Sequence, residues 1–269
     1  PGVGLSSALK SHGVILPESG RRMSENDSVL NIRPKSDFSA RDPVIELIDV
    51  GFTYPGSSSP ALNNISLKMY PSQITIILGS NGSGKSTLAR HLNGTLRPDS
   101  GKVILFGEDM SGRPPKNLTR FVGLVSQHAD HQLFEENIVN ELSFGLENIG
   151  VPDEEIKSRI SDILSSFDLG HIDPKTPPLR LSVGEKQRIC IASVLIMKTP
   201  VVVLDEPSLG LDEGLKRRLA DTLKEMCRDR RSVVVMTHDL EFASLCADRV
   251  LVMDHGKIGY DSLSCDASI

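Results

Sequence analysis

Short apolar runs bounded by turn residues recur along the chain and predict β-strands. Ile74–Leu78, Val201–Leu204 and Ser232–Thr237 are almost continuously apolar and rich in β-branched residues, which is typical of parallel strands buried on both faces. Val44–Val50 is also strand-like. Leu62–Met69 instead alternates apolar and polar residues, which predicts a strand with one exposed face.

Shorter runs extend this pattern. Lys102–Gly107 and Phe121–Gln127 each predict one further strand. Arg249–Asp254 and Lys257–Tyr260 flank His255–Gly256, which predicts a closing hairpin.

Between Asn137 and Phe167 the apolar residues recur at helical spacing, and acidic residues suit the first turn of a second helix. We interpret both stripes as helical core rather than as a cofactor-binding surface. Together they predict a helical subdomain, at about 131–195, inserted between two parts of a sheet. The two stripes are Ile138, Leu142, Leu146 and Ile149, then Ile156, Ile160, Ile163, Leu164 and Phe167.

Three other helices are predicted. Leu88–Leu92 follows a strand, and Glu213–Cys227 follows another. The third begins after Ser182, which has the S-x-x-E spacing of a capping box with Glu185, and it ends before Pro200. Strands that alternate with helices predict an α/β protein with a parallel sheet, and residues 44–262 are the expected domain.

Composition limits the classes of protein. The 269 residues are 39% hydrophobic and 24% charged, as in ordinary globular proteins. A net charge of -5 gives no basic surface for nucleic acid, and no apolar run is long enough to cross a bilayer. The four scattered cysteines indicate neither a disulfide framework nor a zinc site, so reduced thiols in the cytosol are expected. Residues 1–43 and 263–269 are predicted tails, and Met23 is a candidate native start.

A glycine-rich segment between a predicted strand and a predicted helix matches G-x-x-x-x-G-K-[ST]. Backbone N–H groups of such a loop point at an anion, and the start of the following helix adds a positive field. A glycine-rich turn that binds nothing is the alternative, and four fixed residues in this setting disfavour it. Lys85 should reach the β- and γ-phosphates and Ser86 should bind Mg²⁺. The segment consists of Gly79, Ser80, Asn81, Gly82, Ser83, Gly84, Lys85, Ser86 and Thr87.

Other polar residues follow predicted strands, where ligands of parallel sheets bind. Asp205 could polarise or hydrogen-bond the coordination shell of Mg²⁺, and Glu206 could orient or deprotonate a water beside the γ-phosphate. Taken alone, these acids could be surface-turn residues, His238 could be structural, and Gln127 would mean little. The phosphate loop makes one shared site the better interpretation.

The motifs and their order along the chain resemble those of ABC-transporter ATPase subunits over roughly Val44 to Tyr260. The resemblance implies a P-loop NTPase (RecA-like) fold with an added antiparallel β subdomain. Gly79–Thr87 is similar to Walker A, Leu181–Glu185 to the signature motif, and Val201–Glu206 to Walker B. Ser208–Asp212 is similar to the D-loop. The signature motif is the most specific of these, because other phosphate-loop ATPases lack it.

The resemblance implies roles for single residues. Glu206, His238 and Gln127 would be catalytic. The Mg²⁺ site would be formed by Ser86, Gln127 and Asp205. Tyr54 would stack on adenine. The nucleotide would also contact the signature residues Ser182 and Gly184 and the D-loop residue Asp212.

The signature departs from L-S-G-G-Q, because Val183 replaces a glycine and Glu185 replaces the glutamine. A narrower resemblance, to energy-coupling-factor and cobalt-type importer ATPases, covers Gln127–Phe134 and Glu141–Asn148. Ala129 stands where that pattern has proline. Those importers take up vitamins or transition-metal ions.

The resemblance implies an ATP-hydrolysing transporter subunit, at the cytoplasmic face of the membrane as a peripheral protein. It would bind Mg-ATP in a head-to-tail dimer with a second copy or a paralogue, and it would move a transmembrane partner. The alternatives are an ATPase of another ABC importer or exporter, a soluble ABC protein of translation or DNA repair, and a nucleotide-binding regulator without turnover.

Overall fold

The computed structural model describes residues 42–113, 118–128 and 131–262. Nearly all of the predicted tail 1–43 and the whole of 263–269 lie outside the described residues, as do Met23, Ala129 and Cys265.

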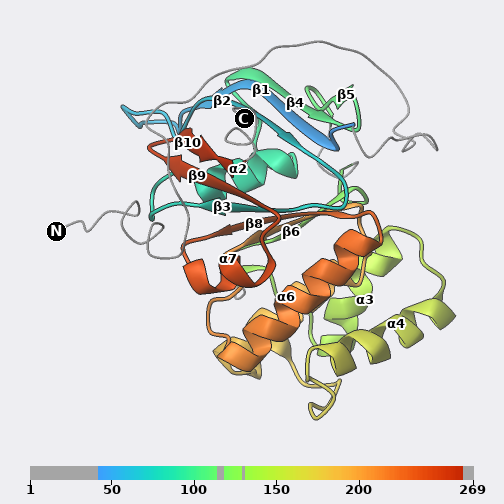
Figure 1. Ribbon diagram of the computed structural model, residues 1–269. Helices are drawn as coiled ribbons and strands as arrows, with labels where there is room; N and C mark the ends of the chain where they lie inside the picture. The colour runs from blue at the N-terminus through green and yellow to red at the C-terminus, as the bar shows by residue number, and fades with distance from the viewer. Residues whose placement is uncertain (1–41, 114–117, 129–130, 263–269) are drawn as a thin grey trace.

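A six-stranded sheet forms the centre of the domain (Figure 1). Its strands are parallel except for the edge strand β10, which pairs antiparallel with β9 through the predicted hairpin. The parallel α/β core predicted from the apolar runs is therefore confirmed. In spatial order the strands are β10 (Lys257–Asp261), β9 (Arg249–Asp254), β3 (Ile74–Leu78), β8 (Ser232–Thr237), β7 (Val201–Asp205) and β6 (Val122–Val125).

A second sheet is antiparallel and contains β2 (Leu62–Met69), β1 (Ile45–Phe52), β4 (Ser100–Leu105) and β5 (Glu108–Asp109), in that order. The predicted strand at 102–107 was misplaced by two residues at each end. Ser100 already pairs with Gly51, and Phe106–Gly107 form the two-residue turn into β5, which was not predicted.

Helix α2 lies between the two sheets, and α3, α4, α6 and α7 lie beyond the opposite face of the central sheet (Figure 1). Helices α3, α4 and α5 lie between β6 and β7 in the chain, as expected for the inserted helices. The short α7 and a 3₁₀ turn at Pro178–Arg180 were not predicted. The helices are α2 (Lys85–Leu92), α3 (Ile138–Asn148), α4 (Asp153–Ser166), α5 (Val183–Leu195), α6 (Glu213–Arg228) and α7 (Leu240–Cys246).

Two apolar cores cover the two faces of the central sheet. Successive side chains of β7 show the division, because Val202 and Leu204 belong to the core with α3 to α7, whereas Val201 and Val203 face α2 and the antiparallel sheet. Burial on both faces explains the unbroken apolar sequence of this strand.

Hydrogen bonds join the inserted helices to the segments around them. The buried Glu141 of α3 accepts from the backbone N–H groups of Phe134 and Glu135, both at 2.9 Å. Arg188 of α5 donates to the carbonyl of Phe167 at 2.9 Å, and Arg159 of α4 donates to that of Ile196 at 3.1 Å. The Arg188 bond thus joins α5 to the end of α4, and the Arg159 bond joins the middle of α4 to the end of α5.

Cys190, Cys227 and Cys246 are free and buried, and burial raises the pKa of each thiol to about 12. Only the thiolate reacts, so at pH 8 its population should be about a thousandfold smaller than for an ordinary thiol. We expect these three residues to resist iodoacetamide at pH 8 in the folded protein and to react in urea. Mass spectrometry of the alkylated peptides measures both, and equal rates would contradict the burial.

Among the described helices, none combines the length and the apolar character that a membrane span requires.

Candidate functional site

The glycine-rich segment connects β3 to α2 and wraps around the start of that helix. Gly84 is the N-cap of α2 with φ of 105°, and a Cβ atom there would lie 2.5 Å from the carbonyl oxygen of Ala61. A Cβ at Gly79 would likewise lie 2.5 Å from the carbonyl oxygen of Met253. Both positions therefore require glycine, and the loop takes the tight course that a phosphate cradle needs.

Lys85 is buried at the first position of α2. Its Nζ donates to the carbonyl oxygens of Gly79, at 2.8 Å, and Ser80, at 3.1 Å, and it lies 3.8 Å from Oε1 of Glu206. Burial lowers the pKa of the ammonium, while Glu206 and Asp205 oppose that shift. The ammonium is thus held inside the loop, where it can meet an anion.

Asp205 ends β7 beside the start of α2. Burial raises the pKa of its carboxyl and Glu206 adds to this, whereas a hydrogen bond from Ser86 and the charge of Lys85 oppose it. Its Oδ1 is buried and has no hydrogen-bond partner among the described residues. A buried carboxylate oxygen in need of a partner, beside the Ser86 hydroxyl, suits a hard divalent cation.

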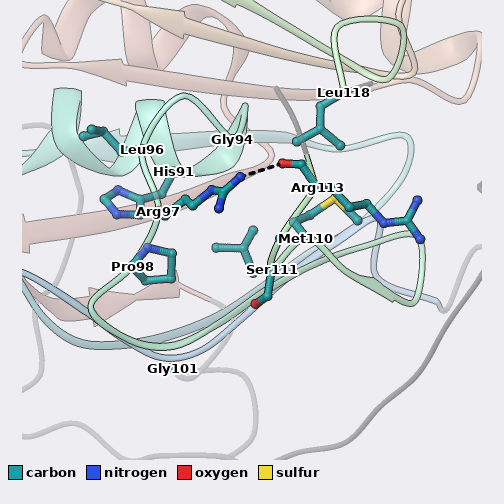
Figure 2. Close-up of a pocket in the computed structure, with 12 residues that line it drawn as sticks. His91, Gly94, Leu96, Arg97, Pro98, Gly101, Met110, Ser111, Arg113 and Leu118 are labelled. Atoms are coloured by element: carbon teal, nitrogen blue, oxygen red, sulfur yellow. Dashed lines mark hydrogen bonds between the residues drawn. The ribbon is translucent and has the colours of Figure 1, made fainter. Parts of the chain in front are cut away.

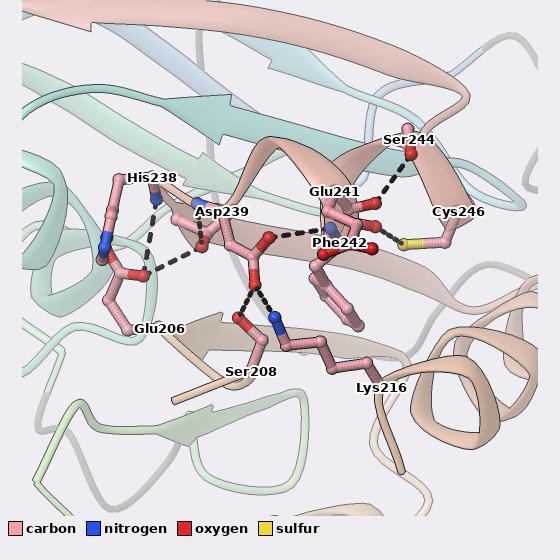
Figure 3. A network of polar contacts seen from close by, with 10 residues as sticks. Glu206, Ser208, Lys216, His238, Asp239, Glu241, Phe242, Ser244 and Cys246 are labelled. Atoms are coloured by element: carbon pink, nitrogen blue, oxygen red, sulfur yellow. Dashed lines mark hydrogen bonds and ion pairs between the residues drawn. The ribbon is translucent and has the colours of Figure 1, made fainter. Parts of the chain in front are cut away.

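Glu206 is buried and has a strained backbone, with φ of 51°. Its Oε2 accepts from the Thr237 hydroxyl at 2.9 Å, and its Oε1 lies 2.8 Å from Nδ1 of His238. The side chain of His238 is more than half exposed, so the pair presents one buried carboxylate and one accessible imidazole (Figure 3).

Strand register brings these residues together. Leu78, directly before the glycine-rich segment, is level with Thr237 of β8, and Asp205 is level with Met236. The segment, Asp205–Glu206 and His238 therefore leave the sheet at one edge, as the sequence predicts.

Tyr54 lies beside the end of the glycine-rich segment. Its hydroxyl is 3.2 Å from that of Thr87, and its ring packs edge-on against Phe52 with centroids 4.9 Å apart. The residue is 37% exposed, so a surface remains for a further planar group.

Gln127 follows β6 and is half-buried, and its side chain makes no hydrogen bond within the described part of the chain. Gln132 instead forms the bonds of this loop: its Oε1 accepts from the N–H and the hydroxyl of Ser126, and its Nε2 donates to the carbonyl of Leu124. The role expected of Gln127 stays a prediction.

The signature residues form a separate surface. Ser182 caps α5 in the predicted capping box, with its hydroxyl 2.6 Å from Oε2 of Glu185. A Cβ at Gly184 would lie 3.0 Å from the carbonyl oxygen of Gly210, so the signature abuts the D-loop, whose Asp212 caps α6. No described hydrogen bond or ion pair joins these residues to the phosphate loop.

A cavity of about 130 Å³ lies at the other end of α2, between the helix and the β4–β5 hairpin (Figure 2). His91, Arg97 and Arg113 line it, and Arg97 donates to the carbonyl of Arg113 at 3.3 Å. It contains none of the predicted site residues.

The residues at the sheet edge fit a nucleotide triphosphate and its cation. The glycine positions leave room for phosphate at the backbone, Lys85 supplies the positive charge, and Asp205 and Ser86 are oxygen ligands of the kind Mg²⁺ takes. Sequence reasoning missed Thr237, which orients Glu206. A hydroxyl directly before a histidine at a strand end was the available signal.

Comparisons with known proteins identify the family of the chain. Residues 62–209 match the family model described as ABC transporter. The chain is 37% identical to the energy-coupling factor transporter ATP-binding protein EcfA of Methanothermobacter thermautotrophicus, over 80% of this chain and 69% of that protein. It is 38% identical to a putative ABC transporter ATP-binding protein of Methanosarcina acetivorans, but it spans only 42% of that protein's length.

Solved structures agree in fold. The chain superposes on cbiO1 of Clostridium perfringens, described as part of the ABC transporter complex cbiONQ, with a TM-score of 0.71, 32% identity and coverage of 84% and 92% of the two chains. It also superposes on a dimeric bacterial ABC transporter cassette, with a TM-score of 0.76, 25% identity and coverage of 81% and 97%. The fold is that of the P-loop NTPases, and the chain belongs to the ABC transporter family of ATP-binding cassettes.

Proposed function

We propose that this protein is the ATP-hydrolysing subunit of an ABC-type membrane transporter, an importer of the energy-coupling-factor class. The observation that carries the ATPase assignment is the convergence of Lys85, Asp205 and Glu206 at one sheet edge, with His238 at 2.8 Å from Glu206.

Each of these residues has a chemical task. Lys85 and the glycine-rich backbone bind the β- and γ-phosphates, because they present positive charge in a buried setting. Glu206 orients a water and takes its proton, and His238 contacts the γ-phosphate from the exposed side. Mg²⁺, held by Ser86 and Asp205 with Gln127 near its water shell, would neutralise charge on the phosphates.

Half of the proposed ATP site must come from a second chain. Ser182 and Gly184 form an exposed helix start suited to an anion, yet they have no link to the phosphate loop of their own chain. A head-to-tail dimer would place them, together with Asp212 of the same chain, on the ATP bound to the partner. The partner is a second copy or a paralogue.

An exposed apolar surface supports a membrane partner. Phe134, Val139 and Phe144 are 61%, 37% and 44% exposed, and the two aromatic rings pack edge-on with centroids 4.8 Å apart. Such rings on an otherwise polar surface mark contact sites. A cytoplasmic helix of a transmembrane subunit would bind here, which makes this protein peripheral at the cytoplasmic face.

The substrate class rests on the relatives. EcfA proteins carry the energy-coupling factor name, and cbiO1 is described as part of cbiONQ. These names support the resemblance to energy-coupling-factor and cobalt-type importers, and from that resemblance we infer transport of a vitamin or a transition-metal ion. An ATPase of another ABC importer or exporter, or a soluble ABC ATPase, is the alternative.

Copurification from native membranes tests this function. We expect the tagged protein to retain a membrane partner, and Phe144→Glu to lose it while keeping basal ATPase activity. Ser158→Glu, which also replaces a neutral residue by a carboxylate and lies exposed on α4, is the matched control. Retention of the partner by Phe144→Glu would contradict the docking surface. Absence of any membrane protein from the native sample would favour a soluble ABC ATPase.

Substitution of Tyr54 separates stacking from hydrogen bonding. Tyr54→Ala should raise the KM for ATP about tenfold, because base–aromatic stacking contributes about 1–3 kcal/mol. Tyr54→Phe keeps the ring and loses only the contact with Thr87, so its KM should stay within about twofold. Steady-state phosphate release measures both. Equal effects of the two variants would assign the role to the hydroxyl instead.

A further inference from the structure

Asp239 follows His238 directly and connects three parts of the molecule (Figure 3). Its Oδ1 accepts from the N–H of Phe242 at 2.9 Å and so caps α7. Its Oδ2 accepts from the Ser208 hydroxyl at 2.9 Å and from Nζ of Lys216 at 2.6 Å. Ser208 begins the D-loop and Lys216 lies in the first turn of α6, so one carboxylate holds both sides of the D-loop.

The same residue is linked to the buried carboxylate of the ATP site. The N–H of Asp239 donates to the Thr237 hydroxyl at 3.0 Å, and that hydroxyl donates to Oε2 of Glu206 at 2.9 Å. A continuous series of hydrogen bonds therefore runs from Glu206 through Thr237 and Asp239 to Ser208 and Lys216.

Lys216 is the shared cation of three carboxyl groups, those of Asp239, Glu213 and Glu241. A hydrogen bond to Asp239 raises the pKa of Lys216, and the charges of Glu241 and Glu213 add to the shift. Glu213 also raises the pKa of Glu241 through a hydrogen bond between the two carboxyls. Burial alone would raise the pKa of Asp239, but the bonds from Lys216, Phe242 and Ser208 lower it. Removal of Lys216 would leave three carboxyl groups from α6 and α7 without their shared cation.

The far end of the D-loop touches the signature. A Cβ at Gly210 would lie 3.6 Å from Cγ1 of Val183, and a Cβ at Gly184 would lie 3.0 Å from the carbonyl oxygen of Gly210. The D-loop and the start of α5 therefore lie against each other, so a displacement of the D-loop would reach the signature.

We propose that Asp239 and Lys216 are positioning residues that hold the D-loop between Glu206 and the signature, so that the state of one ATP site reaches the helix presented to the partner's site. This inference rests on the proposed dimer. The inference extends the proposed function by naming two residues outside the proposed nucleotide contacts and by giving them a measurable coupling.

Three substitutions test the positions separately. Lys216→Met removes the cation, Ser208→Ala removes only the D-loop contact, and Asp239→Asn keeps an N-cap for α7 while it removes the charge. Lys216→Arg is the conservative rescue. Lys224→Met is the matched control, since Lys224 lies on the same helix, is exposed and only approaches Asp221 at 3.9 Å.

We expect Lys216→Met to lower kcat about tenfold, with the affinity of the monomer for ATP unchanged within about twofold, because coupling residues modulate the linked step rather than either binding contact. In a Glu206→Gln background the same change should weaken ATP-driven dimerisation by a similar factor. Lys216→Arg should restore most of the activity. The double variant Asp239→Asn/Lys216→Met should be no worse than the more impaired single variant, as for one shared interaction.

If Lys216→Met and Lys224→Met give the same kcat and the same dimerisation, the proposal is wrong. If Lys216→Met does not fold, Ser208→Ala and Asp239→Asn decide, and wild-type kcat in both would overturn it. Failure of the proposed function would give a different result: the wild-type protein would not hydrolyse ATP, and Glu206→Gln would not dimerise with ATP.

Discussion

Lys85→Ala should weaken ATP binding by at least about thirtyfold, which corresponds to about 2 kcal/mol or more for a buried charge–charge contact. Nζ of Lys85 is fixed by the carbonyl oxygens of Gly79 and Ser80, so the charge is in place before any ligand arrives. Alanine removes the only side-chain cation that the described contacts place within the phosphate loop, and it leaves Asp205 and Glu206 to repel an incoming anion.

Titration calorimetry with ATP measures this loss. Lys85→Met is the better companion variant, because it keeps the volume of a buried side chain while it removes the charge. Lys224→Ala, on the surface of α6, controls for removal of a lysine elsewhere. Wild-type affinity in Lys85→Met, with an unchanged melting temperature, would remove Lys85 from phosphate binding.

Much of the fold could be predicted because the apolar runs have unambiguous periods. Val201–Leu204 and Ser232–Thr237 are buried on both faces, and that burial is what produces an unbroken apolar strand. Helix α7 escaped prediction because its seven residues span only two turns. Its apolar contacts are limited to a few positions such as Phe242 and Cys246.

The composition of the site was also predictable, but its internal bonds were not. The phosphate loop and the acids of β7 are recognisable as local motifs. By contrast, the bonds from Thr237 to Glu206 and from Lys216 to Asp239 join residues 31 and 23 positions apart. They depend on strand register and on the packing of α6 against α7, which local pattern does not encode. The positive φ of Glu206 is likewise a result of its surroundings.

Glu206→Gln should lower kcat by about two to four orders of magnitude, the usual range for loss of a general base. Glutamine keeps the size of the side chain, and its amide oxygen can still accept from the Thr237 hydroxyl that now bonds Oε2. It cannot take a proton from water. Lys85 keeps its two backbone acceptors, so the phosphate loop and ATP binding should persist.

A variant that binds ATP without cleaving it should accumulate in the closed form, since only turnover reopens the dimer. Phosphate release at steady state gives kcat, and light scattering with Mg-ATP gives the mass of the complex. Glu154→Gln, on the exposed first turn of α4, is the matched control. Normal turnover by Glu206→Gln would remove Glu206 from the catalytic role. Loss of ATP binding together with turnover would make Glu206 a structural partner of Lys85, because the 3.8 Å ion pair would then be what holds the loop in shape.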